Sequence, residues 1–159
     1  MTAPGTVSHA LPGHLIRRLH QISTQLFLQR VADAGHDLTP VQFAALDAIG
    51  HYPGIDQAGL ADHIAKDRAT TGSVIERLER KRLLVRTVSA RDKRARVLTL
   101  TEEGCKTVAA LLPVVTGLQR DILQGLDEAE YATFVKLAAK AAKQADALVS
   151  TPGDGTNRG

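Results

Sequence analysis

The stretch from Asp56 to Thr101 constrains the fold of this chain more than any other part of it. Its hydrophobic periodicity and cap residues predict a short helix, a turn, a second helix, a strand, a charged tip and a second strand. Residues 66–96 also hold 11 lysines and arginines against 4 acidic residues, whereas the whole chain has a net charge of only +3. A solvated charged face is the alternative interpretation, but a basic block that coincides with this pattern indicates a surface that meets phosphates.

Composition favours packed helices in a reducing compartment. Of 159 residues, 43% are hydrophobic, and only two Tyr and three Phe are aromatic, so Leu, Val, Ile and Ala must fill the core. The single cysteine, Cys105, excludes an internal disulfide bond. No apolar run approaches the ~20 residues of a membrane span, and the first residues lack the basic and apolar regions of a secretory signal. We therefore expect a cytoplasmic protein with no membrane partner.

Cap residues and proline divide the chain into six helices and a hairpin. Pro12 opens a helix that Gly35 ends, and Thr39-Pro40 begins the next. Asp56 and Asp67 are expected to cap the two short helices of the central stretch, and Thr101 the long helix that follows. Strands are predicted at 84–88 and 96–100. Asp127 with Glu130 forms a capping box for a last helix that runs to about Val149.

Three of these helices, the first and the last two, have about 20 residues or more and would each be ~30 Å long. They cannot all bury their apolar faces on the compact middle of the chain, so we expect them to pack against a second copy. The predicted organisation is a flexible arm at 1–10, a helical dimerisation region at 11–36 and 101–149, a DNA-binding domain at 37–100 and a disordered tail at 150–159.

The central stretch fits a helix-turn-helix whose second helix enters the major groove by its N-terminal part. The outward positions expected to contact DNA from that helix are Arg68, Thr70, Thr71, Ser73 and Arg77. Gly72 lacks a side chain, and this would let the backbone approach DNA closely, unless it is merely tolerated there. The hairpin makes the domain a winged helix, with Arg91, Lys93 and Arg94 at the tip for the minor groove and Asp92 orienting an arginine.

The segment LTPVQFAALDAI…GLADHIAKDRATTGSVIERLERKRLLVRTVSARDKRARVLTLTEEG resembles the MarR (multiple antibiotic resistance regulator) family of bacterial transcription factors. The resemblance rests on LT-x-x-QF-x-x-L, LA-x-x-I, DR-x-T, the wing R-D-x-R-A and the closing LT-x-x-G. It implies a homodimeric winged-helix repressor that binds a palindromic operator and is released by a small ligand. Asp92 and Arg94 match the acidic-x-Arg wing signature. Arg82 departs from the family, which commonly has glycine there, and this puts the expected left-handed turn in doubt.

The opening PGHLIRRLHQI resembles a subgroup that often controls aromatic-acid degradation, which implies an aromatic or heteroaromatic carboxylate as effector and no cofactor. Arg18 lies beside the apolar stripe of the first helix, and Arg17 faces away from it unless a second subunit covers it. Either guanidinium can clamp a carboxylate with two hydrogen bonds. The further candidate ligand-binding residues, which can donate to a ring hydroxyl or ring nitrogen, are His14, His20, His51 and Tyr52. Salt bridges across a dimer are the alternative role of the arginines.

Other functions have weaker support in the sequence. No cluster of Cys and His has the spacing of a metal site, and no catalytic fingerprint is present, so we predict neither a metal site nor an enzyme. Redox sensing through Cys105, in the first turn of its helix, remains an alternative, as does a ligand-independent architectural DNA-binding protein.

Overall fold

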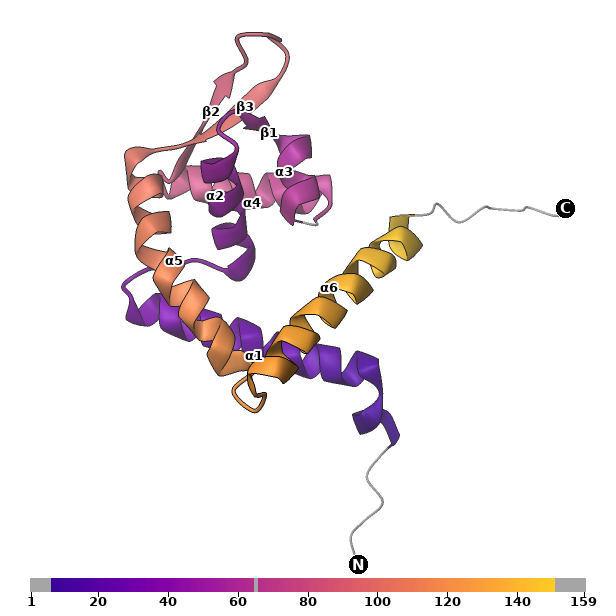
Figure 1. The fold of residues 1–159 in the computed structure, drawn as a ribbon. Helices are drawn as coiled ribbons and strands as arrows, with labels where there is room; N and C mark the ends of the chain where they lie inside the picture. Colours follow the sequence, from indigo (N-terminus) through magenta and orange to yellow (C-terminus); the bar gives the residue numbers. More distant parts are fainter. Residues whose placement is uncertain (1–6, 65, 151–159) are drawn as a thin grey trace, which may run out of the picture. The chain divides into compact units, whose positions relative to one another are not determined.

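A computed structural model describes residues 7–64 and 66–150. Most of the arm expected at 1–10 and of the tail expected at 150–159 lies outside the described residues. Residues Val7–Ala10 form a 3-10 turn, η1. The chain divides into two units, the first ending at Ile122 and the second beginning at Leu123. The bounds of the helices and strands, shown in Figure 1, are α1 Pro12–Asp33, α2 Pro40–His51, β1 Ile55–Asp56, α3 Gln57–Ile64, α4 Arg68–Arg80, β2 Leu84–Val88, β3 Arg96–Leu100, α5 Glu102–Ile122 and α6 Glu128–Ser150.

The helix starts follow the cap residues of the sequence. Thr39 and Gln42 form a complete capping box on α2, and Asp67 accepts the backbone N–H of Thr70 at the start of α4. Asp56 caps α3 by accepting the N–H of Gly59 at 2.8 Å. Each of these bonds satisfies a backbone donor that the first turn of a helix leaves without a partner. The predicted starts of these helices are therefore confirmed.

The first unit is a winged helix held on two long helices. Strands β2 and β3 pair antiparallel with Leu84 opposite Leu100 and Val88 opposite Arg96, and β1 adds to the other edge of β3. Helix α1 packs along α5, and α2, α3 and α4 pack on one another. A single core joins these elements, and its fully buried side chains include Leu46, Ile49, Leu60, Ile75, Leu78, Leu84, Leu98, Leu111 and Leu118. The expected fold, mainly α with a small β-wing, is confirmed.

Arg82 connects α4 to the wing in a left-handed conformation. Its φ of 59° is the one positive φ among the non-glycine residues that the structure describes. Left-handed backbone costs a non-glycine residue about 1–2 kcal/mol. Here the carbonyl of Arg82 accepts the hydroxyl of Thr101 at 2.7 Å, and its N–H donates to Glu79. The left-handed turn, which glycine commonly makes in the resembled family, is therefore supported by one tertiary hydrogen bond, from Thr101, and one local hydrogen bond, to Glu79.

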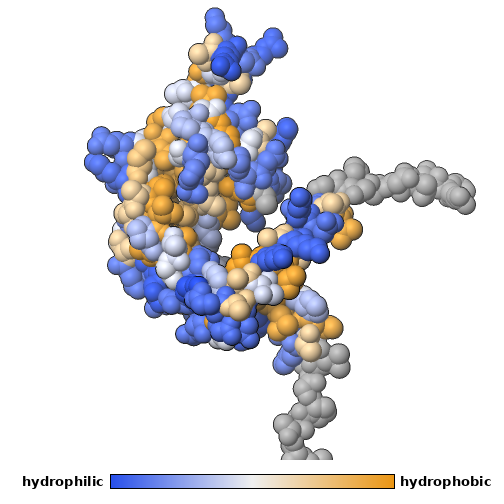
Figure 2. Space-filling model, in the orientation of Figure 1, coloured by the Kyte–Doolittle hydropathy of each residue, from blue (hydrophilic) through white to orange (hydrophobic). Residues whose placement is uncertain are grey.

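Hydrophobic side chains remain at the surface of both units (Figure 2). On α1, Leu15 is 49% and Ile16 67% exposed, and the half-buried Leu19 continues the stripe. In the second unit, α6 has no buried side chain over its described residues, and Phe134 and Leu137 line an apolar hollow of about 380 Å³. A single chain thus leaves the apolar stripes of two long helices in contact with water. Among the described residues, no helix is both long and apolar enough to cross a membrane.

Candidate nucleic-acid interface

The N-terminal turn of α4 is held by Asp67 and presents polar side chains. The carboxylate of Asp67 accepts the backbone N–H of Thr70 at 2.8 Å and its hydroxyl at 2.7 Å. These hydrogen bonds, the backbone one first, lower the pKa of Asp67 below its ordinary value. Asp67 is therefore ionised at neutral pH and complements the positive end of the helix. Four of the predicted contact residues on α4 are exposed, in this turn or further along the helix: Arg68, Thr70, Ser73 and Arg77.

Thr71 is not an outward residue, so its prediction as a DNA contact is wrong. Its side chain is 0% exposed, and its hydroxyl donates to the carbonyl of Asp67 at 2.8 Å. Thr71 precedes Val74, Ile75 and Leu78 by three, four and seven residues, and this spacing places it on the inward stripe of the helix. A threonine fits there because the bond to Asp67 satisfies its only polar atom.

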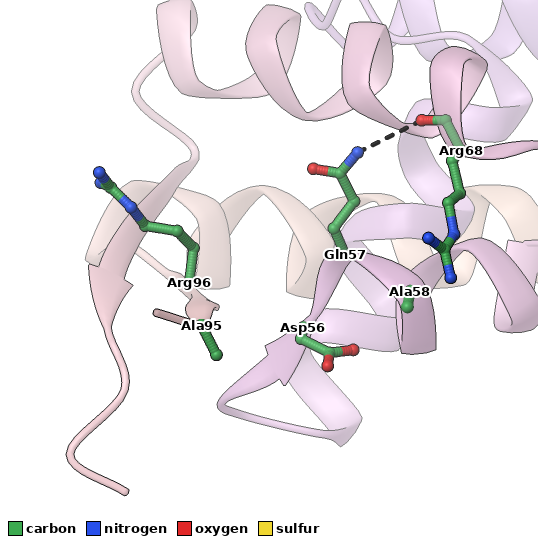
Figure 3. Close-up of a pocket in the computed structure, with 6 residues that line it drawn as sticks. All are labelled: Asp56, Gln57, Ala58, Arg68, Ala95 and Arg96. Atoms are coloured by element: carbon green, nitrogen blue, oxygen red, sulfur yellow. Dashed lines mark hydrogen bonds between the residues drawn. The ribbon is translucent and has the colours of Figure 1, made fainter. Parts of the chain in front are cut away.

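Gly72 accommodates a neighbouring helix. A Cβ at this position would lie 3.2 Å from Nε2 of Gln57, the first residue of α3. That amide nitrogen donates to the carbonyl of Arg68 at 3.3 Å and so connects α3 to the start of α4 (Figure 3). The missing side chain of Gly72 therefore makes room for Gln57 within the protein.

A hollow of about 300 Å³ lies between α3, the start of α4 and the base of the wing. Figure 3 shows the residues that line it: Asp56, Gln57, Ala58, Arg68, Ala95 and Arg96. Sequence reasoning missed Gln57 and Arg96 as members of this surface. No spacing in the sequence relates Gln57 to Arg68 or to Arg96, because only the tertiary packing of α3 against α4 and β3 brings them together.

The tip of the wing is an ordered, basic turn. The N–H of Ser89 donates to Ala95 at 2.9 Å, and the hydroxyl of Ser89 accepts the N–H of Arg91 at 3.2 Å. The carboxylate of Asp92 accepts the backbone N–H of Arg94 at 3.0 Å, so it shapes the turn through the main chain of an arginine. Arg91, Lys93 and Arg94 are exposed and form no ion pair with any residue that the structure describes.

Some of the basic residues in the segment 66–96 are engaged within the protein, Arg86 and Lys81 among them. Arg86 on β2 makes a two-bond contact with Glu79 on α4, with N–O distances of 2.9 and 3.2 Å. These bonds lower the pKa of Glu79 and raise that of Arg86. Lys81 is held by the carbonyl and the carboxylate of Asp37. The ion pair of Arg86 with Glu79 connects the wing to α4, so the wing and α4 keep a fixed orientation relative to each other.

The candidate ligand residues form two separate groups within one chain. On α1, a guanidinium nitrogen of Arg17 lies 3.3 Å from Nδ1 of His14, and the ring of His14 stacks on that of His9. Partial burial, and then the positive charges of His9, Arg17 and Arg18, lower the pKa of His14. A neutral ring at pH 7 can accept a hydrogen bond from Arg17. Arg18 is exposed and joins no ion pair in the described part of the chain.

The second group lies where α2 meets α3. Tyr52 follows His51, and their ring centroids are 6.5 Å apart. Tyr52 also stacks on His63 at 4.6 Å, a neighbour that the sequence did not reveal because it lies 11 residues further along. Nδ1 of His51 is 3.0 Å from the carbonyl of Asp47. Among the described residues, no hydrogen bond, ion pair or ring contact joins either His51 or Tyr52 to the group on α1.

The chain resembles known regulators over most of its length. Residues 36–95 match the model of the MarR family. The transcriptional regulator HosA of Escherichia coli O157:H7 is 36% identical over 127 residues, which cover 78% of this chain and 93% of HosA.

Two solved structures are similar in fold and in sequence. One is a structure of BpsR from Bordetella bronchiseptica, described as showing the mechanism by which 6-hydroxynicotinic acid regulates its DNA binding. It is 30% identical to this chain with a TM-score of 0.79, and the match covers 88% of this chain and 98% of the BpsR chain. The other is the transcriptional repressor CouR bound to a 23-mer DNA duplex, which is 27% identical with a TM-score of 0.80 and covers 89% and 99% of the two chains.

Proposed function

Because the chain belongs to the MarR family and is a transcriptional regulator rather than an enzyme, we propose that it is a homodimeric repressor that binds a palindromic operator and is released by an aromatic carboxylate. The observation that carries the DNA-binding part is the exposed polar face of α4 beside a basic wing fixed to it by Arg86 and Glu79. The similar CouR is a repressor bound to duplex DNA, which supports this assignment.

In the proposed complex, the N-terminal turn of α4 enters the major groove and the wing reaches the minor groove. Arg68, Thr70, Ser73 and Arg77 are the proposed contacts from the helix, and Arg91, Lys93 and Arg94 those from the wing. Asp92 acts by holding the turn that carries Arg94. Two copies related by a two-fold axis reach successive major grooves about 34 Å apart, so the operator is an inverted repeat.

The DNA contacts are tested by two substitutions with different expected effects. Arg94→Ala should weaken binding to operator and unrelated duplex alike and reduce the salt dependence of log K by about one, because a wing arginine mainly releases counterions. Arg68→Ala should instead reduce the preference for operator by about 1–3 kcal/mol, as expected for a lost base contact. Fluorescence anisotropy over a salt series, with a duplex selected by the wild-type protein from a random pool, measures both quantities.

Lys106→Ala provides the matched control for both variants. It also removes one positive charge, but from α5, where Lys106 pairs with Glu102 at 2.9 Å. Its affinity for both duplexes should stay close to that of the wild type. If Arg94→Ala and Arg68→Ala behave like this control, the proposed interface is wrong.

The proposed effector is a benzoate- or nicotinate-type acid. BpsR, whose DNA binding is regulated by 6-hydroxynicotinic acid, is similar over 88% of this chain. In this chain, Arg17 and His14 already form a polar pair at 3.3 Å beside the exposed Leu15 and Ile16. A guanidinium next to apolar side chains suits an aromatic acid, with the carboxylate on the arginine and the ring on the apolar surface. We assign binding of the carboxylate to Arg17 or Arg18. We assign binding of the ring substituents to His14, His51 and Tyr52, with the two groups of residues brought together across the dimer.

The acid releases the protein from DNA if it binds more tightly to a dimer whose recognition helices are not spaced to reach successive major grooves. A preference of about 3 kcal/mol lowers operator affinity on the order of 100-fold, and operator DNA must weaken the acid by the same factor. Calorimetry with benzoate, 4-hydroxybenzoate and nicotinate should show binding to the wild type, and Arg17→Ala or Arg18→Ala should reduce this binding. Arg30→Ala is the control: Arg30 lies on the same helix but pairs with Asp121, so this variant should still bind the acids. Binding that tolerates an amide in place of the carboxylate, or the absence of binding by every acid, would contradict this assignment.

A further inference from the structure

A third hollow, of about 380 Å³, lies at the other end of α4 from its N-terminal turn. We call it the α2–α4 hollow; its lining residues are Asp37, Thr39, Gln42, Arg77, Arg80 and Lys81. Lys81 is engaged with Asp37, and Arg80 lies 3.8 Å from Glu76, while Arg77 has no ion pair among the described residues. The hollow therefore carries a net positive charge at the start of α2, whose first turn contains no acidic residue.

Gln42 supplies a hydrogen-bond donor to this hollow from within the fold. The residue is only 5% exposed, and its side-chain oxygen accepts the N–H of Thr39 at 3.1 Å to complete the capping box. Its amide nitrogen makes no hydrogen bond within the described part of the chain and is open to solvent, since no fully buried side-chain nitrogen there lacks a partner. A held amide that offers N–H groups beside two arginines is suited to an oxyanion.

The position of the hollow on α4 indicates which anion it meets. Ser73, Arg77 and Arg80 are exposed and lie within about 60° of one another around the helix, so the hollow continues the face that we assign to DNA. Helix α4 has 13 residues and is therefore about 20 Å long, whereas the major groove is about 12 Å wide. If its N-terminal turn is in the groove, its last turns reach the sugar–phosphate backbone at the groove's edge.

We propose that the α2–α4 hollow binds a backbone phosphate of the DNA, with Gln42 donating from α2 and Arg77 and Arg80 from α4. This inference rests on the proposed function, since it needs the N-terminal turn of α4 in the major groove. It adds a contact that is independent of base sequence and that fixes how deeply and at which angle the helix enters. Arg77 then serves the backbone as well as, or in place of, a base edge.

Gln42→Glu tests the phosphate contact with little change in structure. Glutamate has the same length, keeps the oxygen that Thr39 uses, and is as suitable as glutamine in a capping box. It replaces the donor by a carboxylate that repels phosphate, so affinity for a random-sequence duplex should fall about ten-fold or more. Gln119→Glu on α5 makes the same change of charge outside the hollow and should alter affinity little. Arg80→Gln, on an exposed side chain, should weaken binding and lower the salt slope by about one.

Three outcomes separate the possibilities. If the wild type binds duplex DNA but Gln42→Glu and Arg80→Gln bind as tightly as Gln119→Glu, the hollow does not hold a phosphate and the proposed function stands. If the wild type binds no duplex, both proposals fail. If millimolar inorganic phosphate raises the melting temperature of the wild type but not of Gln42→Glu, and DNA affinity is equal in both, the hollow holds a small anion and the DNA contact is overturned. Should Gln42→Glu unfold in a thermal melt, Arg80→Gln alone decides.

Discussion

Replacing Gly104 by alanine is expected to destabilise the first unit by on the order of 4 kcal/mol, a large share of the 5–15 kcal/mol that stabilise a typical domain. A Cβ at this position would lie 2.0 Å from the carbonyl oxygen of Leu83 and 3.0 Å from its carbonyl carbon. Both are backbone atoms, so no side-chain rotation relieves the clash.

The surrounding hydrogen bonds prevent the backbone from moving away. The carbonyl of Leu83 accepts the N–H of Thr101 at 3.1 Å, and the hydroxyl of Thr101 accepts the N–H of Gly104 at 3.0 Å. Leu83 itself is buried where α4 turns into the wing. Relief of the clash therefore requires α5 to separate from the junction that orients the wing, and DNA binding should fall together with stability.

Urea unfolding followed by circular dichroism measures the effect, and Gly117→Ala is the matched control on the same helix. Nothing lies within 4 Å of a Cβ at Gly117, so alanine there should stabilise α5 by about 0.5–1 kcal/mol through its higher helix propensity. Equal unfolding midpoints for the two variants would show that Leu83 and Gly104 are not in close contact in solution.

Leu137→Asp is expected to convert the proposed dimer into monomers at micromolar concentration. Leu137 is 56% exposed in the single chain and lines the apolar hollow of α6 with Leu126, Ala129 and Phe134. In a two-fold dimer the substitution acts on both copies, so two carboxylates enter the same interface without a partner. Light scattering should then give the 17.0 kDa of one chain, where the wild type gives about twice that mass.

Operator affinity should fall with the dimer, by on the order of 100-fold or more, because each monomer then binds its half-site without the high effective concentration of a linked partner. Lys136→Asp is the control, since residue 136 lies about 160° from Phe134 and 100° from Leu137 around the helix. It adds the same carboxylate to the polar side of α6 and should leave the dimer intact. A folded wild-type monomer that binds the palindrome with full affinity would rule out the dimeric mechanism.

The elements whose causes are local could be predicted from the amino-acid sequence. The strands at 84–88 and 96–100 have the predicted bounds, and α2, α3 and α4 begin where their cap residues indicated. A cap, a turn or a periodic stripe depends on residues within one or two helical turns, so its signal is contained in a short window of sequence. The two-residue strand β1 was missed, because it exists only through pairing with β3 some 40 residues away.

Tertiary packing controls which side chains of these elements remain available for contacts. Thr71 reads as a polar residue of the recognition helix, yet the packing of α4 buries it against the core. Arg86 reads as one more cation for DNA, yet Glu79 on α4 holds it within the protein. Gln42 completes the capping box of α2, and only the approach of Arg77 and Arg80 makes it part of a hollow. Local sequence sets the direction of a side chain relative to its own helix, whereas burial and pairing depend on which other elements fold against it.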